Sequence, residues 1–210
     1  FRVRANNQLG TGPWSDVLGP VVPQPKPAVV LAVDTGSSPS DGITQDGLVN
    51  VTGLIPLAQW QYRIGGGAWT DGSGNSFSLA EGVYSSGSVE VRQFVAGFPS
   101  VPATNAIGWT VDSTAPAVPV IVAVFDNVSP VTGGISDGGS TNDATPRFSG
   151  TVELAATLSV AINGGSPVSV PVSQGTWVYW PPALENGTHT FSFVATDVAG
   201  NVSPARIFSL

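Results

Sequence analysis

The chain has 210 residues, of which 41% are hydrophobic and only 10% are charged, and its 14 acidic residues outnumber seven Lys and Arg. An acidic chain without clustered cations is unsuited to binding nucleic acid or an anionic membrane surface. Because it has no Cys, it can form no disulfide, zinc–thiolate site or thiol nucleophile. The hydrophobic content is high enough for folded cores, and no apolar run approaches the ~18 residues that span a membrane. Met is also absent, so we expect a fragment or processed product whose export signal or anchor lies elsewhere.

The first 25 residues differ from the rest. Residues 1–7 (Phe-Arg-Val-Arg-Ala-Asn-Asn) and 10–15 (Gly-Thr-Gly-Pro-Trp-Ser) resemble the last two strands of a fibronectin type III domain. Pro23, Pro25 and Pro27 then predict a stiff, extended spacer. We therefore assign residues 1–25 to the end of a fibronectin-like domain and a Pro-rich linker.

Local patterns predict strands along the remaining chain. Polar and apolar residues alternate in segments 59–64 and 189–196, and residues 120–125 are β-branched, apolar and aromatic. The pairs Asp71-Gly72, Asn163-Gly164 and Asn186-Gly187 are typical of hairpin turns. No amphipathic helix is evident, so the predicted fold class is all-β.

An internal repeat divides this region into two units. Asp46 and Gly53 reappear as Asp143 and Gly150, with the same offset of 97 residues. A repeat of ~95 residues matches one Greek-key immunoglobulin-like sandwich. Residues 112–116, Asp-Ser-Thr-Ala-Pro, read as the linker. We therefore predict two tandem sandwiches, a first unit of residues 26–112 and a second unit of residues 113–210.

The second unit resembles the bacterial immunoglobulin-like repeats of large surface adhesins and biofilm-associated proteins. The resemblance rests on motifs through the whole unit, at residues 112–116, 126–128, 141–146, 150–153, 175–179 and 195–201. The first unit matches more loosely, because Phe94 stands where the pattern places the Asp that the second unit has at position 197. In that family the repeats form long stalks, and calcium at the junctions stiffens them.

Sandwich topology predicts where such calcium would bind. The loop between the first two strands (A–B loop) lies at the far pole of the first unit, beside the outgoing linker. The loop between the last two strands (F–G loop) of the second unit faces the same junction. Ca²⁺ takes ~6–8 oxygen ligands, so carboxylates gathered there would favour it. The candidate ligands are Asp34, Asp41, Asp46, Asp112, Asp197 and Asn201. By the same reasoning Asp126, Asp137 and Asp143 would serve a following junction.

Alternative interpretations exist for these residues. Asp and Asn are common in turns because their side chains bind nearby backbone amides, with no metal needed. His189, the only His, alternates with strand residues and is read as a packed sheet position, so no catalytic constellation is found. Trp177, Tyr179 and Trp180 cannot share one face of a strand, and Trp177 is predicted to lie in the core.

These observations predict a non-enzymatic stalk segment of a secreted bacterial surface adhesin, stiffened by calcium at its junctions. The expected partners are neighbouring repeats of the same chain, with any host-surface or glycan ligand elsewhere in the parent protein. Two alternatives stay open: a structural module of a phage or virion tail fibre, and an accessory carbohydrate-binding module of a secreted enzyme. An exposed coplanar Trp pair would favour the last of these. The expected location is the bacterial cell surface, or the virion under the second alternative.

Overall fold

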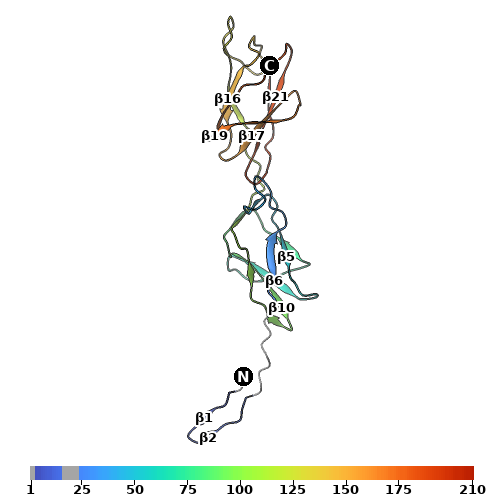
Figure 1. The fold of residues 1–210 in the computed structure, drawn as a ribbon, viewed down its shortest axis with the longest axis vertical. Helices are drawn as coiled ribbons and strands as arrows, with labels where there is room; N and C mark the ends of the chain where they lie inside the picture. Colours follow the sequence, from blue (N-terminus) through green and yellow to red (C-terminus); the bar gives the residue numbers. More distant parts are fainter. Residues whose placement is uncertain (1–2, 16–23) are drawn as a thin grey trace.

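The computed structural model describes residues 3–15 and 24–210. In these two ranges the chain forms strands joined by turns, and no helix there could cross a membrane. Two β-sandwiches follow one another along the long axis of the molecule, and a short hairpin lies at the N-terminal end (Figure 1). The predicted all-β class with tandem immunoglobulin-like sandwiches is confirmed.

The N-terminal hairpin consists of β1 (Asn6–Asn7) and β2 (Gly10–Thr11), which pair antiparallel. The guanidinium of Arg4 lies 4.6 Å from the ring centroid of Trp14. The structure therefore contains the two paired strands expected here, while their fibronectin-like origin stays a prediction. Residues 1–2 and 16–23 of this segment, including Pro23 of the predicted spacer, lie outside the described ranges.

The first unit is built from short strands arranged in three sheets. Its strands are β3 (Ala28–Leu31), β4 (Ile43–Thr44), β5 (Leu48–Thr52), β6 (Trp60–Ile64), β7 (Thr70–Asp71), β8 (Ser76–Ser78), β9 (Gly82–Tyr84), β10 (Val89–Val95), β11 (Phe98–Pro99), β12 (Ala103–Thr104) and β13 (Trp109–Val111). One sheet has the order β3-β5-β8, and another has the order β11-β10-β6-β7 with β12 also paired to β10. In the third sheet β13 pairs parallel with β4 and antiparallel with β9.

Alternation along β5 and β10 directs every second side chain into the core of the first unit. Val49, Val51, Val89 and Val91 are buried there, together with Trp60. The Trp60 indole packs on Gly72, where a Cβ atom would lie 2.2 Å from the ring, and its Nε1 donates to the Gly74 carbonyl at 2.9 Å. The prediction of a hairpin turn at Asp71-Gly72 is wrong, because Asp71 belongs to β7 and Gly72 is needed beneath the indole.

The second unit forms two sheets that face each other. Its strands are β14 (Val120–Asp126), β15 (Gly133–Gly134), β16 (Arg147–Thr151), β17 (Thr157–Ile162), β18 (Val168–Val170), β19 (Val172–Ser173), β20 (Thr176–Tyr179), β21 (Thr190–Thr196) and β22 (Arg206–Ser209). The sheet orders are β15-β14-β16-β20-β19 and β18-β17-β21-β22. The predicted hairpin turn at Asn163-Gly164 is confirmed, because both residues have positive φ between β17 and β18.

An aromatic core holds the second unit together. Phe148, Phe191 and Phe193 are fully buried, and the Trp177 ring stacks on Phe193 with 5.0 Å between centroids. The prediction of Trp177 in the core is therefore confirmed. Trp180, which directly follows β20, is 57% exposed.

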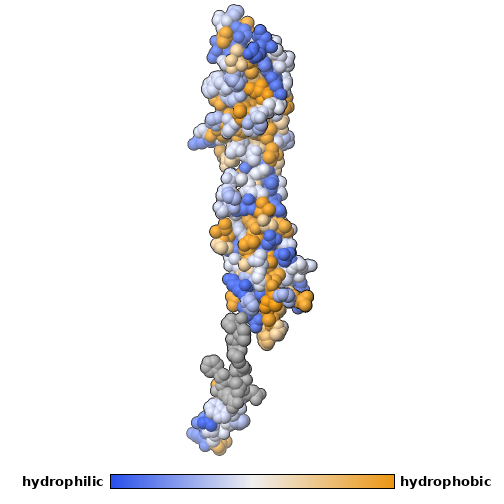
Figure 2. All heavy atoms as spheres, turned by 45° about the vertical axis from the view of Figure 1, so that its right-hand side comes forward, coloured by the Kyte–Doolittle hydropathy of each residue, from blue (hydrophilic) through white to orange (hydrophobic). Residues whose placement is uncertain are grey.

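Figure 2 shows one side of the molecule and the apolar side chains exposed on it. On the side shown in Figure 2 they are interspersed with polar side chains along both sandwiches.

Candidate functional site at the junction between the two units

The junction brings together the A–B loop of the first unit, the linker at residues 112–116 and the F–G loop of the second unit at residues 197–201. The A–B loop follows β3 and returns through β4. The linker follows β13, which pairs with β4, so loop and linker leave the first unit side by side. The F–G loop connects β21 and β22 at the facing pole of the second unit.

Two glycines allow the backbones of the two units to touch. A Cβ atom on Gly36 would lie 2.0 Å from the Val198 carbonyl oxygen, and one on Gly200 would lie 3.1 Å from the Gly36 Cα. Both residues have positive φ, +88° and +96°, which side chains with a Cβ rarely adopt. Glycine is therefore required on each side of the contact.

Three hydrogen bonds cross the junction beside the glycine contact. The Thr35 hydroxyl donates to the Ala199 carbonyl at 2.6 Å, and the Ser37 N–H donates to the Val198 carbonyl at 3.3 Å. The Asn201 amide nitrogen donates to the Asp112 carbonyl at 2.7 Å. The two units therefore meet directly, through neutral donors and backbone acceptors.

Carboxylates on both sides hold the linker itself. Glu81 of the first unit accepts hydrogen bonds from the Ser113 hydroxyl at 2.8 Å and the Thr114 hydroxyl at 3.0 Å. These donors lower the pKa of Glu81. Glu153 of the second unit accepts from the Ala117 N–H at 3.1 Å. Both ends of the linker are therefore fixed to the unit that they adjoin.

Most candidate calcium ligands have peptide partners close in the sequence. Asp41, Asp46 and Asp112 each accept a hydrogen bond from the N–H two residues ahead, at 3.0 Å in each case. Asp197 accepts from the Asn201 backbone and side-chain N–H groups at 2.8 and 2.9 Å. The contacts of Asp41, Asp46 and Asp112 are those expected for Asx turns.

Asp34 differs from the other candidate ligands. Its Oδ2 accepts from the Gly42 N–H at 2.9 Å, while its Oδ1 is buried without a hydrogen-bond partner. A buried carboxylate oxygen without a donor is costly, and a cation would satisfy it. Across residues 3–15 and 24–210, however, no three Asp, Glu or His side chains are grouped to hold a metal ion. A calcium ion here would depend on carbonyl and water oxygens for most of its ligands.

The residues predicted for a following junction separate into two groups. Asp126 and Asp143 are buried and share Thr141, whose hydroxyl donates to Asp126 Oδ2 at 2.6 Å and accepts from the Asp143 N–H at 3.0 Å. This hydroxyl and neighbouring backbone N–H groups lower the pKa of Asp126. Asp137 instead accepts from the Ser209 N–H at 2.8 Å, beside β22.

His189 lies at this same pole of the second unit, beside a cavity of about 300 Å³. Its ring nitrogens lie 2.8 Å from the Glu185 carbonyl and 3.0 Å from the Asn163 amide nitrogen. Both ring nitrogens of His189 therefore take part in contacts between loops. The cavity is lined mainly by the polar segments 140–143 and 185–189.

At the opposite pole of the first unit, Gln93 fixes the incoming chain. The Gln93 side chain is fully buried, accepts from the Ile55 N–H at 2.8 Å and donates to the Pro25 carbonyl at 2.8 Å. In both units, therefore, a carboxamide holds the carbonyl of the entering linker. Sequence reasoning missed Gln93, Thr35 and Gly36. The alignment of Phe94 with Asp197 places Gln93 opposite Thr196 and so hides the parallel with Asn201.

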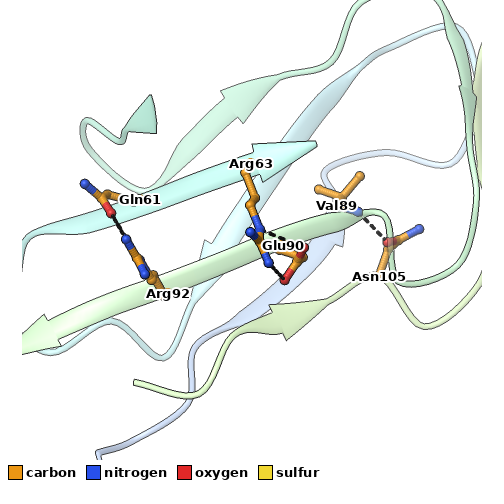
Figure 3. Close-up of polar contacts among 6 residues, drawn as sticks. All are labelled: Gln61, Arg63, Val89, Glu90, Arg92 and Asn105. Carbon is orange, nitrogen blue, oxygen red and sulfur yellow. Dashed lines mark hydrogen bonds and ion pairs between the residues drawn. The ribbon is translucent and has the colours of Figure 1, made fainter. Parts of the chain in front are cut away.

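Two arginines of the first unit make polar contacts across β6 and β10 (Figure 3). Arg63 pairs with Glu90 at 2.8 Å, and Arg92 donates to the Gln61 Oε1 at 2.7 Å, across β6 and β10. The two guanidinium carbons also lie 4.6 and 4.0 Å from the ring centroid of Trp69. Glu90 raises the pKa of Arg63. Because both cations lie against Trp69, we interpret these residues as a self-contained stabilising cluster.

The exposed coplanar Trp pair that would favour a carbohydrate-binding module does not form among Trp60, Trp69, Trp177 and Trp180. Trp60 and Trp177 are each only 3% exposed. Trp69 lies against two arginines, which leaves Trp180 without a coplanar partner among these residues.

Comparison with known proteins gives a family match in the second unit. The model of the bacterial Ig-like domain family matches residues 120–210. No curated protein matches the chain. Similar solved structures include a 1.5-MDa bacterial ice-binding adhesin (15% identity, TM-score 0.37, 91% of this chain and 64% of that chain). Another is the BSP domain of a biofilm-associated protein (14% identity, TM-score 0.29, 80% of this chain and 28% of that chain). A third is the chicken interferon gamma receptor alpha chain (9% identity, TM-score 0.35, 86% of this chain and 98% of that chain).

The TM-scores of these structural likenesses are all below 0.5. The family match covers nearly all of the second unit, from β14 to the last residue. The resemblance to bacterial immunoglobulin-like domains, predicted from the motifs of the second unit, is thus confirmed over residues 120–210.

Proposed function

We propose that this chain is a structural stalk segment of a secreted bacterial surface adhesin, in which the junction keeps successive units aligned. The observation that carries the proposal is the direct contact between units. Gly36 and Gly200 bring the backbones together, and Thr35 and Asn201 each add a hydrogen bond across the junction. A spacer that must project a distant domain needs such fixed joints, because flexible joints shorten its average reach.

Other features support a stalk at a cell surface. The family matched by residues 120–210 is a bacterial immunoglobulin-like one. Each unit has a core of its own and joins the next end to end, as in proteins assembled from repeats (Figure 1). The natural partners under this proposal are the units before and after these two in the same polypeptide.

Calcium at the junction is a further part of the proposal. Its support is the unpartnered Asp34 Oδ1, close in the chain to Asp41 and Asp46 and on the same loop that contacts the second unit. Ca²⁺ accepts carbonyl and water oxygens beside carboxylates, so one or two Asp side chains are enough to begin a site. Bound calcium would neutralise carboxylates that otherwise repel each other, and would add to the direct contacts.

The alignment of the units can be tested by measuring distances between spin labels. The chain lacks Cys, so the pair Val83→Cys and Val168→Cys provides two unique labels at positions that are 80% and 51% exposed. A fixed junction predicts one narrow distance distribution by double electron–electron resonance. The matched control adds Gly36→Asn, whose side chain cannot fit against Val198 and should broaden the distribution. A broad distribution in the unmodified pair would contradict the stalk proposal.

A further inference from the structure

We infer that the second unit stabilises the first, because its F–G loop (residues 197–201) holds together the two strands, β4 and β13, that close the first unit. The junction would then affect the stability of the first unit as well as the angle between the two units. Docking of the second unit would be part of what keeps the first unit folded at this pole. The inference concerns stability alone and does not depend on the adhesin proposal.

β4 and β13 form only a short parallel pair at this pole of the first unit. β4 has two residues, and its register with β13 consists of Ile43 with Thr110 and Thr44 with Val111. Hydrogen bonds from the Thr110 N–H to the Gly42 carbonyl (2.8 Å) and from the Asp112 N–H to the Thr44 carbonyl (2.9 Å) extend it on either side. Parallel pairs are slightly less stable per residue than antiparallel ones, and so short a pair opens easily on its own.

Each strand of this pair is tied at its end to the second unit. After β4, the Gln45 N–H donates to the Thr35 hydroxyl at 2.8 Å, and that hydroxyl donates to the Ala199 carbonyl. After β13, Asp112 bonds to Thr44 through its N–H and accepts from the Asn201 side chain through its carbonyl. A single loop of the second unit therefore holds both strands.

The F–G loop is already ordered within its own unit. The Asn201 N–H and amide group bond to the Asp197 carboxylate, and the Asp197 N–H bonds to the Asn201 carbonyl at 3.1 Å. A preorganised loop loses little conformational entropy when it docks. Most of the interaction energy of the contact is therefore available to the first unit.

The second unit offers an internal comparison. In the second unit the A–B loop is bonded to β22: the Gly138 N–H donates to the Ser209 carbonyl at 2.9 Å, and the Ser209 N–H donates to Asp137 at 2.8 Å. A Cβ on Gly138 would have no atom within 4 Å, although its φ is +78°, close to that of Gly36. Gly138 thus lies in the A–B loop of the second unit, in open space on the described chain.

The test is hydrogen exchange on the full chain with the variant Gly36→Asn. Asn tolerates positive φ, so the substitution mainly introduces a side chain that separates the units. We expect the amides of Thr110 and Asp112 to exchange about five- to tenfold faster, as loss of one or two hydrogen bonds would produce. The control Gly138→Asn should leave these two amides unchanged.

A second variant approaches the contact from the other unit. Asn201→Ala removes the donor to the Asp112 carbonyl, and Asn186→Ala is its control in an exposed loop. Faster exchange at Asp112 in Asn201→Ala, with core amides of β10 and β21 still protected, would support the inference. If spin-label distances show that Gly36→Asn separates the units while Thr110 and Asp112 exchange as before, the inference is overturned. Unchanged exchange in Asn201→Ala would overturn it as well, and neither result would contradict a stalk.

Discussion

At the scale of single residues, Asp126 shows how a buried carboxylate is retained without a cationic partner. The residue is 2% exposed, and its two oxygens accept from the Thr141 hydroxyl and the Val128 N–H at 2.6 and 2.8 Å. Hydrogen bonds to the ionised form lower a carboxyl pKa, and burial opposes them. Here the hydrogen bonds prevail, since the pKa of Asp126 is lowered.

The lowered pKa of Asp126 predicts how acid affects the second unit. A carboxyl whose pKa is lower in the folded than in the unfolded chain contributes stability above its unfolded pKa of about 3.9. That contribution is lost as the pH falls through the folded pKa. Thr141→Val removes the donor with the largest effect, so the acid-unfolding midpoint should move to higher pH in circular dichroism titrations. The control Thr188→Val, in an exposed loop, should keep the original midpoint, and equal midpoints in both variants would contradict this account.

At the scale of elements, the sequence predicted strands where periodicity was strong and failed where one side chain decides the geometry. The alternation at residues 190–196 correctly places Phe191 and Phe193 inside. Asp71-Gly72 has the composition of a turn, yet the space beneath the Trp60 indole determines its conformation. That packing joins residues twelve apart and leaves no periodic signal.

The sequence also contained no indication that Gln93 binds the chain that enters the first unit. One buried carboxamide serves Ile55, Gly53 and Pro25, which come from two separate segments. A polar residue on a strand face that otherwise holds Val89 and Val91 signals such a role only after the core is known. Buried polar groups of this kind are almost always hydrogen-bonded.

Gln93 therefore makes a specific prediction for the first unit. Gln93→Leu keeps a similar volume but leaves the Ile55 N–H and the Pro25 carbonyl without their partner, at a cost of about 1–3 kcal/mol. Calorimetry should show a lower melting temperature for the first unit and an unchanged transition for the second. Gln45→Leu, at an exposed position, is the control. Similar melting of both variants would mean that Gln93 is not important for holding the entering chain.

At the scale of the whole molecule, the topology predicted which loops face each other, and the structure supplies the contacts between them. The A–B loop and the linker of the first unit meet the F–G loop of the second. The prediction from the sequence concerned the Asp residues of these loops, whereas Gly36, Thr35 and Gly200 make much of the contact. Glycine and threonine are common in all loops, so only the three-dimensional arrangement distinguishes these ones.

The calcium proposal predicts a difference between melts of the chain in EDTA and in millimolar Ca²⁺. Extracellular modules bind Ca²⁺ with Kd of ~10⁻⁴–10⁻³ M, so saturation at 10 to 100 times Kd should add about 1–3 kcal/mol per site. For a domain of ~95 residues this raises the melting temperature by roughly 4 °C or more. The increase should vanish in Asp34→Ala, whose Oδ1 is unpartnered, and persist in Asp71→Ala, which bonds to Gln61 away from the junction. Identical melts with and without Ca²⁺ would exclude calcium and leave alignment to the glycine contact and the hydrogen bonds of Thr35, Ser37 and Asn201. An increase that survives in Asp34→Ala would place the ion elsewhere, and the buried pair Asp126 and Asp143 would then be the next site to test.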